Sequence, residues 1–340
     1  MLQGGVRARR AGGEARHEEK RQPTARSEAH RPSWLIRTVG AVRLRRDGNP
    51  GTELADVSGA DMEGAMISCV EQTMNRSMES WLDEQRKLYE GGFYGSSRWR
   101  WVFRDDCRYR GRRLGEVLAM LGVAPAGFDI FELGFGTGDL LFRFPTSCAL
   151  AGVELSAGAV DAIRNDPRLK AYRPGWFEVS PPDGSIPAPP WPADIAIASH
   201  VIEHVSDDRE TVGQLAAILK PGGLLVLFVP VEPEGFDPKH LRRYTARSVT
   251  ELVREAGLEV LHAEENYHIR SGPFSWMDHP SRHGWRVLNF LEGVRNVMMT
   301  LVPYPLARAT EELLAQHGVP GTQCLVVARR TAGHSGRTVR

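Results

Sequence analysis

Three glycines at alternate positions, Gly134, Gly136 and Gly138, are the residues whose type and spacing point most directly to chemistry. They lie in residues 131–139 (FELGFGTGD), directly after a predicted strand. Glycines let a backbone turn tightly and approach a ligand, and the start of a following helix offers unpaired N–H groups. The third glycine stands one residue earlier than in a dinucleotide fingerprint, which has it where Asp139 is found. The spacing disfavours a nicotinamide dehydrogenase, but alone it identifies no ligand.

Two acids accompany the glycines. Glu132 precedes them, and Glu154 ends the next predicted strand. A carboxylate at the position of Glu154 can hold both hydroxyls of a ribose. Proteins that bind nicotinamide cofactors and proteins that bind adenosyl cofactors share such an acid, so it does not decide between the two classes.

Three histidines are candidates for a general base. His200 and His204 bracket a predicted strand-to-helix turn, and His240 follows the next strand, within residues 238–245. A histidine titrates near neutral pH and can accept a proton from a hydroxyl. The sequence does not rank the three.

Alternating strands and helices must position these residues. Short apolar runs predict strands at residues 129–133, 150–154, 176–179, 194–199, 224–229, 258–264 and 323–328. Helices are predicted at residues 139–144, 157–164, 209–219 and 246–256. This alternation predicts an α/β fold with a doubly wound, mostly parallel sheet, whose ligands bind at the carboxyl ends of the strands.

Further elements flank the predicted core. We expect a disordered basic leader over residues 1–61, a helical cap over 62–125 and the Rossmann-like core over 126–264. A helical insertion that serves as a substrate lid follows over 265–321, then the last core strand over 322–330 and a disordered tail over 331–340. The cap is rich in aromatic residues and arginines, and the insertion carries an apolar helical stripe from Val287 to Leu301. We expect this stripe to dock on the core, and a pocket wall or a membrane surface is the alternative.

Composition narrows the class of protein. The 340 residues carry 43 Lys+Arg against 42 Asp+Glu, a net charge of +1, so no nucleic-acid partner is expected. The basic leader is the exception, and it is interpreted as disorder, or as sequence upstream of a true start at Met62, Met66 or Met74, rather than as a binding arm. Four widely spaced cysteines favour a reducing, cytoplasmic location, and no apolar run is long enough for a transmembrane span.

Taken in order, these motifs resemble a class I S-adenosylmethionine-dependent methyltransferase, and most closely the bacterial small-molecule group. The motifs are residues 131–139, Glu154, residues 193–196 (ADIA), 199–207 (SHVIEHVSD) and 219–223 (LKPGG). The resemblance covers roughly residues 128–264 plus the terminal strand. It implies a seven-stranded sheet with the last strand antiparallel and S-adenosyl-L-methionine as cofactor.

The resemblance also implies roles for single residues. The turn at Gly134, Gly136 and Gly138 would pass under the methionine part, and Glu154 would hold the ribose. Asp183 would flank the adenine, although the proline-rich segment 180–187 departs from the family pattern. Glu132, Leu155 and Ser199 complete the expected cofactor-binding set.

Residues 200–204 (HVIEH) also resemble a Glu-x-x-Glu-His cluster that binds a divalent metal in ubiquinone-pathway and small-RNA 2′-O-methyltransferases. His200 replaces the first glutamate, which would shift the preference toward softer cations. The preferred interpretation is structural, with Glu203 capping a helix and His204 beneath the cofactor, so no metal is expected.

The expected reaction is methyl transfer to a small molecule, most readily to an oxygen of a hydrophobic or aromatic metabolite, with nitrogen and carbon left open. One alternative is a nucleic-acid methyltransferase that uses the basic leader. It is disfavoured because residues 199–202 (SHVI) stand where amino-methylating nucleic-acid enzymes carry an Asp/Asn-Pro-Pro-Tyr turn. The other alternative is a non-catalytic cofactor-binding protein.

Overall fold

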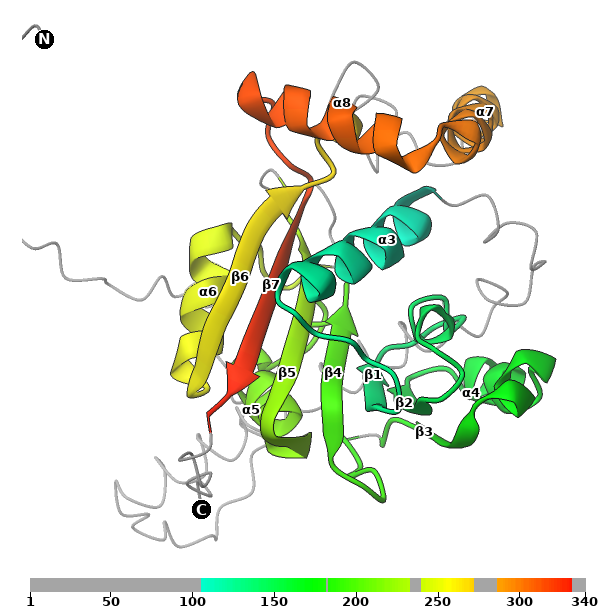
Figure 1. Cartoon of the computed structure of the whole chain (residues 1–340), viewed down its shortest axis with the longest axis vertical. Helices are drawn as coiled ribbons and strands as arrows, with labels where there is room; N and C mark the ends of the chain where they lie inside the picture. The colour runs from blue at the N-terminus through cyan, green and yellow to red at the C-terminus, as the bar shows by residue number, and fades with distance from the viewer. Residues whose placement is uncertain (1–104, 182, 233–239, 272–285, 332–340) are drawn as a thin grey trace, which may run out of the picture. The chain divides into compact units, whose positions relative to one another are not determined.

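A computed structural model describes residues 105–181, 183–232, 240–271 and 286–331 (Figure 1). The predicted leader, the aromatic part of the predicted cap and nearly all of the predicted tail lie outside these residues.

All seven predicted strands form, and they make one sheet in the order β3-β2-β1-β4-β5-β7-β6 (Figure 1). Their bounds are β1 Asp129–Leu133, β2 Ala149–Glu154, β3 Arg173–Val179, β4 Ala193–Ser199, β5 Leu219–Pro230, β6 Leu258–Asn266 and β7 Gln323–Arg330. β1 to β5 pair in parallel, whereas β7 runs antiparallel to both β5 and β6. This topology confirms the predicted doubly wound sheet with an antiparallel last strand.

Helices cover both faces of the sheet. They are α3 Asp105–Met120, α4 Ala157–Arg164, α5 Asp208–Ile218, α6 Ala246–Glu255, α7 Arg286–Leu301 and α8 Tyr304–Gln316, with 3-10 turns η3 Leu141–Arg143, η4 Pro167–Ala171 and η5 His268–Ser271. Apolar residues of α5 and α6 pack in one core, and those of α3 and α4 pack in the other. Successive side chains of a strand point to opposite faces of the sheet, so Ile130 and Phe131 of β1 pack in different cores. Strands buried on both faces explain the nearly continuous apolar runs in the sequence.

The helix predicted at residues 139–144 is wrong. Only the single 3-10 turn η3 forms there. Gly138 has a φ of +71°, outside the helical region, and Phe144 is extended before Pro145. A residue before proline avoids the helical region, so only one turn fits between these two positions.

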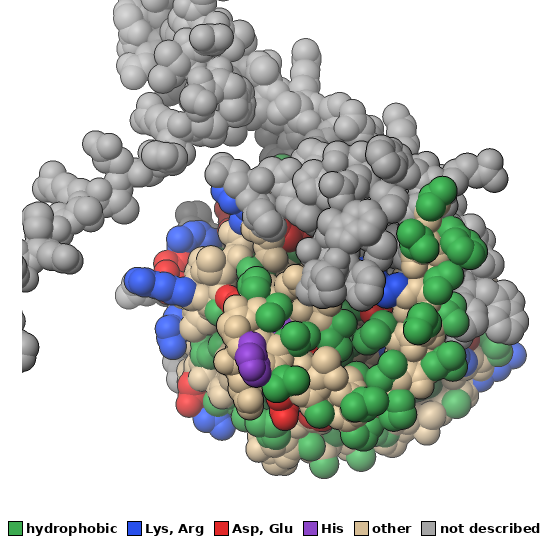
Figure 2. All heavy atoms as spheres, turned by 90° about the horizontal axis from the view of Figure 1, so that it is seen from above, with side chains coloured by type: hydrophobic (Ala, Val, Ile, Leu, Met, Phe, Trp, Pro, Cys, Tyr) green, Lys and Arg blue, Asp and Glu red, His purple; other side chains and the backbone are tan. Residues whose placement is uncertain are grey.

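The apolar stripe of α7 is exposed instead of docked on the core. Val287 and Phe290 are each 70% exposed, and Leu301 is 77% exposed. The end of the molecule that carries α7 and α8 accordingly shows many hydrophobic side chains at its surface (Figure 2). None of the helices in the described part of the chain has both the length and the apolar content needed to cross a bilayer.

A largely buried ion pair joins α3 to β6. Nε of Arg113 donates to Oε1 of Glu264 at 2.6 Å, and Nη2 donates to Oε2 at 2.5 Å, while Nη1 donates to Glu116. Burial alone would raise the pKa of Glu264, but the bonds from Arg113 and Asn266 outweigh it and lower this pKa to about 2. Since the pair is bidentate and largely desolvated, it should contribute more than a surface salt bridge.

We expect this pair to make stability depend on acid. The pKa of Glu264 lies below its ordinary value of 4.5, so the unfolded chain binds the proton first. The contribution, about 3 kcal/mol, is complete above about pH 5 and is lost as the pH falls toward about 2. Urea unfolding at neutral and acidic pH checks it. Glu264→Gln should be about 3 kcal/mol less stable than the parent near neutrality, because Arg113 stays buried without its carboxylate, and nearly equal to it at the acid end. A gap that does not change with pH would contradict this account.

Candidate functional site

The glycine turn lies at the carboxyl end of β1 and has the backbone shape that only glycine adopts easily. Gly134, Gly136 and Gly138 all have positive φ, at 69°, 53° and 71°. A Cβ on Gly134 would lie 2.4 Å from Cγ2 of Val201, in the turn after β4. Glycine is therefore required at this position for its φ and for the close packing of these two turns.

Glu154, the last residue of β2, is bound to the glycine turn. Its Oε2 accepts the N–H of Gly136 at 2.8 Å, and its Oε1 accepts the N–H groups of Leu155 at 2.7 Å and of Ser156 at 3.3 Å. Burial raises the pKa of Glu154, and these N–H bonds oppose the rise. The carboxylate thus faces the turn from the neighbouring strand end, where the resemblance places a ribose.

The other predicted cofactor residues divide into two groups. Glu132 is buried beside the turn, where burial raises its pKa well above the ordinary value. Ser199 ends β4 at the same edge of the sheet. Asp183 is fully exposed, and its carboxylate accepts the N–H and the hydroxyl of Ser185. Among the described residues, Asp183 makes no hydrogen bond or ion pair with the glycine turn, so its adenine role stays a prediction.

The structure brings the three candidate histidines together around Glu203. The rings of His204 and His240 meet edge to face, with centroids 4.8 Å apart. Nδ1 of His200 lies 3.5 Å from Oε1 of Glu203, which is long for a hydrogen bond. His200 has a positive φ of 57°, uncommon outside glycine and typical of functional turns. Val201 links this cluster to the glycine turn.

Residues 240–244 are clamped onto the turn after β4. The N–H of Leu241 donates to the carbonyl of Glu203 at 2.9 Å, and Arg242 donates to the carbonyls of Val205 and Ser206. The buried hydroxyl of Tyr244 donates to Asp208 at 2.7 Å. These bonds hold His240 beside His204, although 36 positions separate them in the sequence.

Sequence reasoning missed two sets of residues at this edge. The first is Glu232, whose Oε2 lies 2.6 Å from Nδ1 of His240. The second is a chain of buried amides in which Gln323 contacts His200 at 3.4 Å and donates to Asn266 at 2.6 Å. In the sequence these residues are visible only as isolated polar residues near the ends of predicted strands. The order of the strands in the sheet is needed to see that they lie close together.

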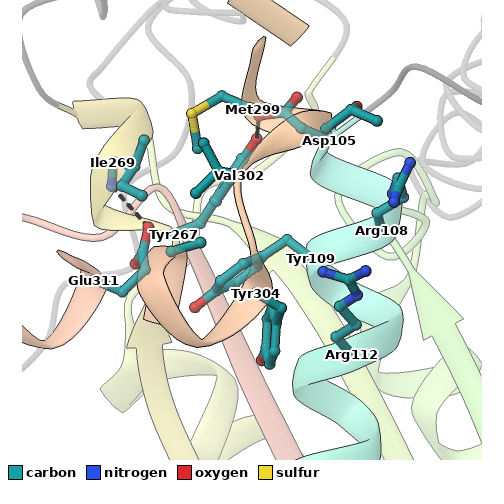
Figure 3. A pocket seen from close by; sticks show the side chains of 12 residues that line it. Asp105, Arg108, Tyr109, Arg112, Tyr267, Ile269, Met299, Val302, Tyr304 and Glu311 are labelled. Atoms are coloured by element: carbon teal, nitrogen blue, oxygen red, sulfur yellow. Dashed lines mark hydrogen bonds between the residues drawn. The ribbon is translucent and has the colours of Figure 1, made fainter. Parts of the chain in front are cut away.

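A small pocket lies where α3, η5, α7 and α8 meet (Figure 3). Tyr109 and Tyr267 stack in it with ring centroids 5.0 Å apart, and Arg112 lies over the ring of Tyr304. The hydroxyl of Tyr267 donates to Asp105 at 2.6 Å. The free volume is about 30 Å³, which holds water but no metabolite. A metabolite would fit in this space only if α7 and α8 moved apart.

Comparison with known proteins places this geometry in a family. A family model described as "Methyltransferase domain" matches residues 106–263. "Probable S-adenosylmethionine-dependent methyltransferase" of Mycolicibacterium smegmatis is 29% identical over 160 residues, which cover 44% of this chain and 59% of that protein. tRNA N(3)-cytidine methyltransferase METTL2 of Danio rerio is 27% identical over 113 residues, which cover 31% and 32%. Phosphoethanolamine N-methyltransferase 2 of Haemonchus contortus, solved with S-adenosyl-L-methionine, has 15% identity and a TM-score of 0.42, over 65% and 52% of the two chains.

The match over residues 106–263, the relatives and the seven-stranded sheet together support a class I S-adenosylmethionine-dependent methyltransferase with S-adenosyl-L-methionine as cofactor. The match spans 59% of the length of the Mycolicibacterium smegmatis relative.

Proposed function

We propose that this chain transfers the methyl group of S-adenosylmethionine to an oxygen of a hydrophobic or aromatic small molecule. One observation supports oxygen most: the histidine-bearing turn after β4 packs directly on the glycine turn. A hydroxyl acceptor must lose a proton as the methyl group arrives, and imidazoles at this edge can promote that loss. Alignment of donor and acceptor supplies much of the remaining acceleration, because methyl transfer is an in-line displacement.

The acceptor would enter between α3 and the helical insertion. The pocket there combines tyrosine rings, Met299 and Val302 with Arg108 and Arg112 (Figure 3). Burial raises the pKa of Tyr109 and Tyr267, so their hydroxyls stay protonated near neutral pH. Apolar walls with a few convergent polar groups suit an aromatic metabolite. The exposed stripe of α7 supports its role as a lid, because a helix that does not pack tightly can move.

Labelled methyl transfer tests this proposal. The full chain is incubated with methyl-labelled S-adenosylmethionine and matched phenols, alcohols, amines and carbon acids, and with a metabolite extract of the cells that carry the gene. We expect label on hydroxylated aromatic compounds. His200→Gln should lower kcat by about 10²–10⁴-fold with little change in KM, because it removes the candidate base on the turn that packs on the glycines. The control, His317→Ala at the residue that follows α8, should retain the parental rate.

The same assay separates the alternatives. Label on amines or carbon acids would favour N- or C-methylation, and label only on small polar acceptors would exclude a hydrophobic substrate. An RNA arm tests the nucleic-acid alternative, since one relative is named for a tRNA substrate. Cofactor binding with no transfer to any acceptor would favour a non-catalytic protein. A cytoplasmic, biosynthetic role remains part of the proposal.

A further inference from the structure

One carboxylate and two imidazoles beside the glycine turn form a potential ligand set for a metal ion. One ligand atom from each of Glu203, His204 and His240 lies within 4.8 Å of the other two. Ligands at about 2.0–2.2 Å from a tetrahedral ion are roughly 3.5 Å apart, so a contraction of about 1 Å would complete the set. Small side-chain rotations can supply this.

The buried carboxylate of Glu203 is the strongest reason to expect a cation at this place. Its side chain is fully buried, and neither carboxylate oxygen accepts a well-formed hydrogen bond from the described residues. A buried polar group without such bonds costs about 1–3 kcal/mol, and a charged carboxylate costs more. His200 at 3.5 Å offers only a distant partner. A divalent ion between Glu203 and the two imidazoles would compensate the buried charge directly.

Glu232 gives His240 the surroundings of a metal ligand. A histidine that binds a metal through one ring nitrogen usually donates the other N–H to a carboxylate, which sets its tautomer and orientation. Oε2 of Glu232 lies 2.6 Å from Nδ1 of His240, and this contact favours the tautomer that carries the proton on Nδ1 and presents Nε2 to a metal. The clamp through Leu241 and Arg242 holds this ring against the turn that carries the other two residues.

We propose that Glu203, His204 and His240 bind one divalent transition-metal ion, with Glu232 as the positioning residue for His240. Two imidazoles and one carboxylate suit Zn²⁺, Fe²⁺ or Mn²⁺ better than Mg²⁺ or Ca²⁺, which prefer all-oxygen sites. Three protein ligands leave positions for water or for a hydroxyl of the acceptor. Sequence analysis preferred a structural role for Glu203 and His204, and the contacts of His240 with His204 and Glu232 come only from the tertiary structure.

The consequence for chemistry rests on the proposed function. An ion at this site would lower the pKa of a coordinated hydroxyl and orient it toward the methyl donor. His204 and His240 would then act as ligands rather than as bases, and His200 would remain as the nearby proton acceptor.

Metal uptake tests the site without any methyl transfer, so its failure is distinct from failure of the proposed reaction. The full chain is treated with chelator, dialysed against Zn²⁺, and assayed for bound metal by mass spectrometry and for affinity by calorimetry. We expect about one Zn²⁺ per chain and a rise in melting temperature on binding. His240→Ala and Glu203→Ala should each lower affinity by more than about 100-fold, and Glu232→Gln by about 10–100-fold.

A matched control guards against adventitious binding and misfolding. His317→Ala removes the imidazole that follows α8, outside the cluster, and should bind Zn²⁺ as the parent does. Melting curves in chelator show whether each variant is folded, and the Co²⁺-loaded protein should lose its visible absorption in His240→Ala. Negligible uptake by the parent would overturn the proposal. So would stoichiometric binding that persists in both His240→Ala and Glu203→Ala.

Discussion

Replacing Gly134 by alanine should lower the free energy of unfolding by about 2–5 kcal/mol. About 1–2 kcal/mol reflects the positive φ, which alanine adopts poorly, and about 1–3 kcal/mol reflects forced packing of the new Cβ. That Cβ would lie 2.4 Å from Cγ2 of Val201, far inside van der Waals contact. Urea unfolding measures the loss, and calorimetry with S-adenosylhomocysteine should show weaker binding, because the glycine turn and the turn after β4 must separate.

Two further variants divide this loss into its causes. Gly222 also has a positive φ, at 82°, but open space around its Cβ position, so Gly222→Ala should lose only the conformational part. Val201→Ala in the Gly134→Ala background leaves Cβ of residue 201 at 3.6 Å, an ordinary contact, and should recover about 1–3 kcal/mol. If Gly134→Ala and Gly222→Ala lose equal stability, the clash with Val201 does not explain why glycine is needed.

Replacing Glu154 by alanine should weaken binding of S-adenosylhomocysteine about 100-fold. Hydrogen bonds between a charged carboxylate and ribose hydroxyls contribute about 1.5–3 kcal/mol each, and about 1.4 kcal/mol corresponds to tenfold in affinity. The variant also loses the bonds from the N–H groups of Gly136 and Leu155, so the empty turn becomes less ordered. Calorimetry at constant pH measures the change.

A ligand comparison separates recognition of the ribose from support of the turn. The parent should bind an analogue that lacks both ribose hydroxyls far more weakly than S-adenosylhomocysteine, whereas Glu154→Ala should bind the two alike. Glu178→Ala removes a half-exposed acid of the neighbouring strand and should leave affinity unchanged. An unchanged affinity in Glu154→Ala would exclude this carboxylate from the cofactor site.

The sequence predicted the sheet well because burial on both faces leaves a local signal. Each strand carries an apolar run, and each of α4, α5 and α6 begins at a capping side chain, as Ser156, Asp207 and Thr245 show. The prediction failed where local signals compete. At residues 139–144 the apolar run favoured a helix, but Gly138 and Pro145 bounded it too closely.

The candidate site likewise contains residues that the sequence could predict and residues that it could not. Gly134, Gly136, Gly138 and Glu154 were predictable because the glycines follow β1 and Glu154 ends β2, and the carboxyl ends of parallel strands share one edge. Asp183 could not be placed, since an exposed turn leaves no periodic signal in the sequence.

By itself, then, the sequence determined the strand–helix alternation, the glycine turn and the acid that faces it. Only the tertiary structure decided that Glu203, His204 and His240 meet, that Glu232 orients His240, and that Arg113 is joined to Glu264. The physical reason is the range of the forces involved. Periodicity and capping act over a few neighbouring residues, whereas these contacts join residues brought together by crossovers whose course depends on how both cores pack.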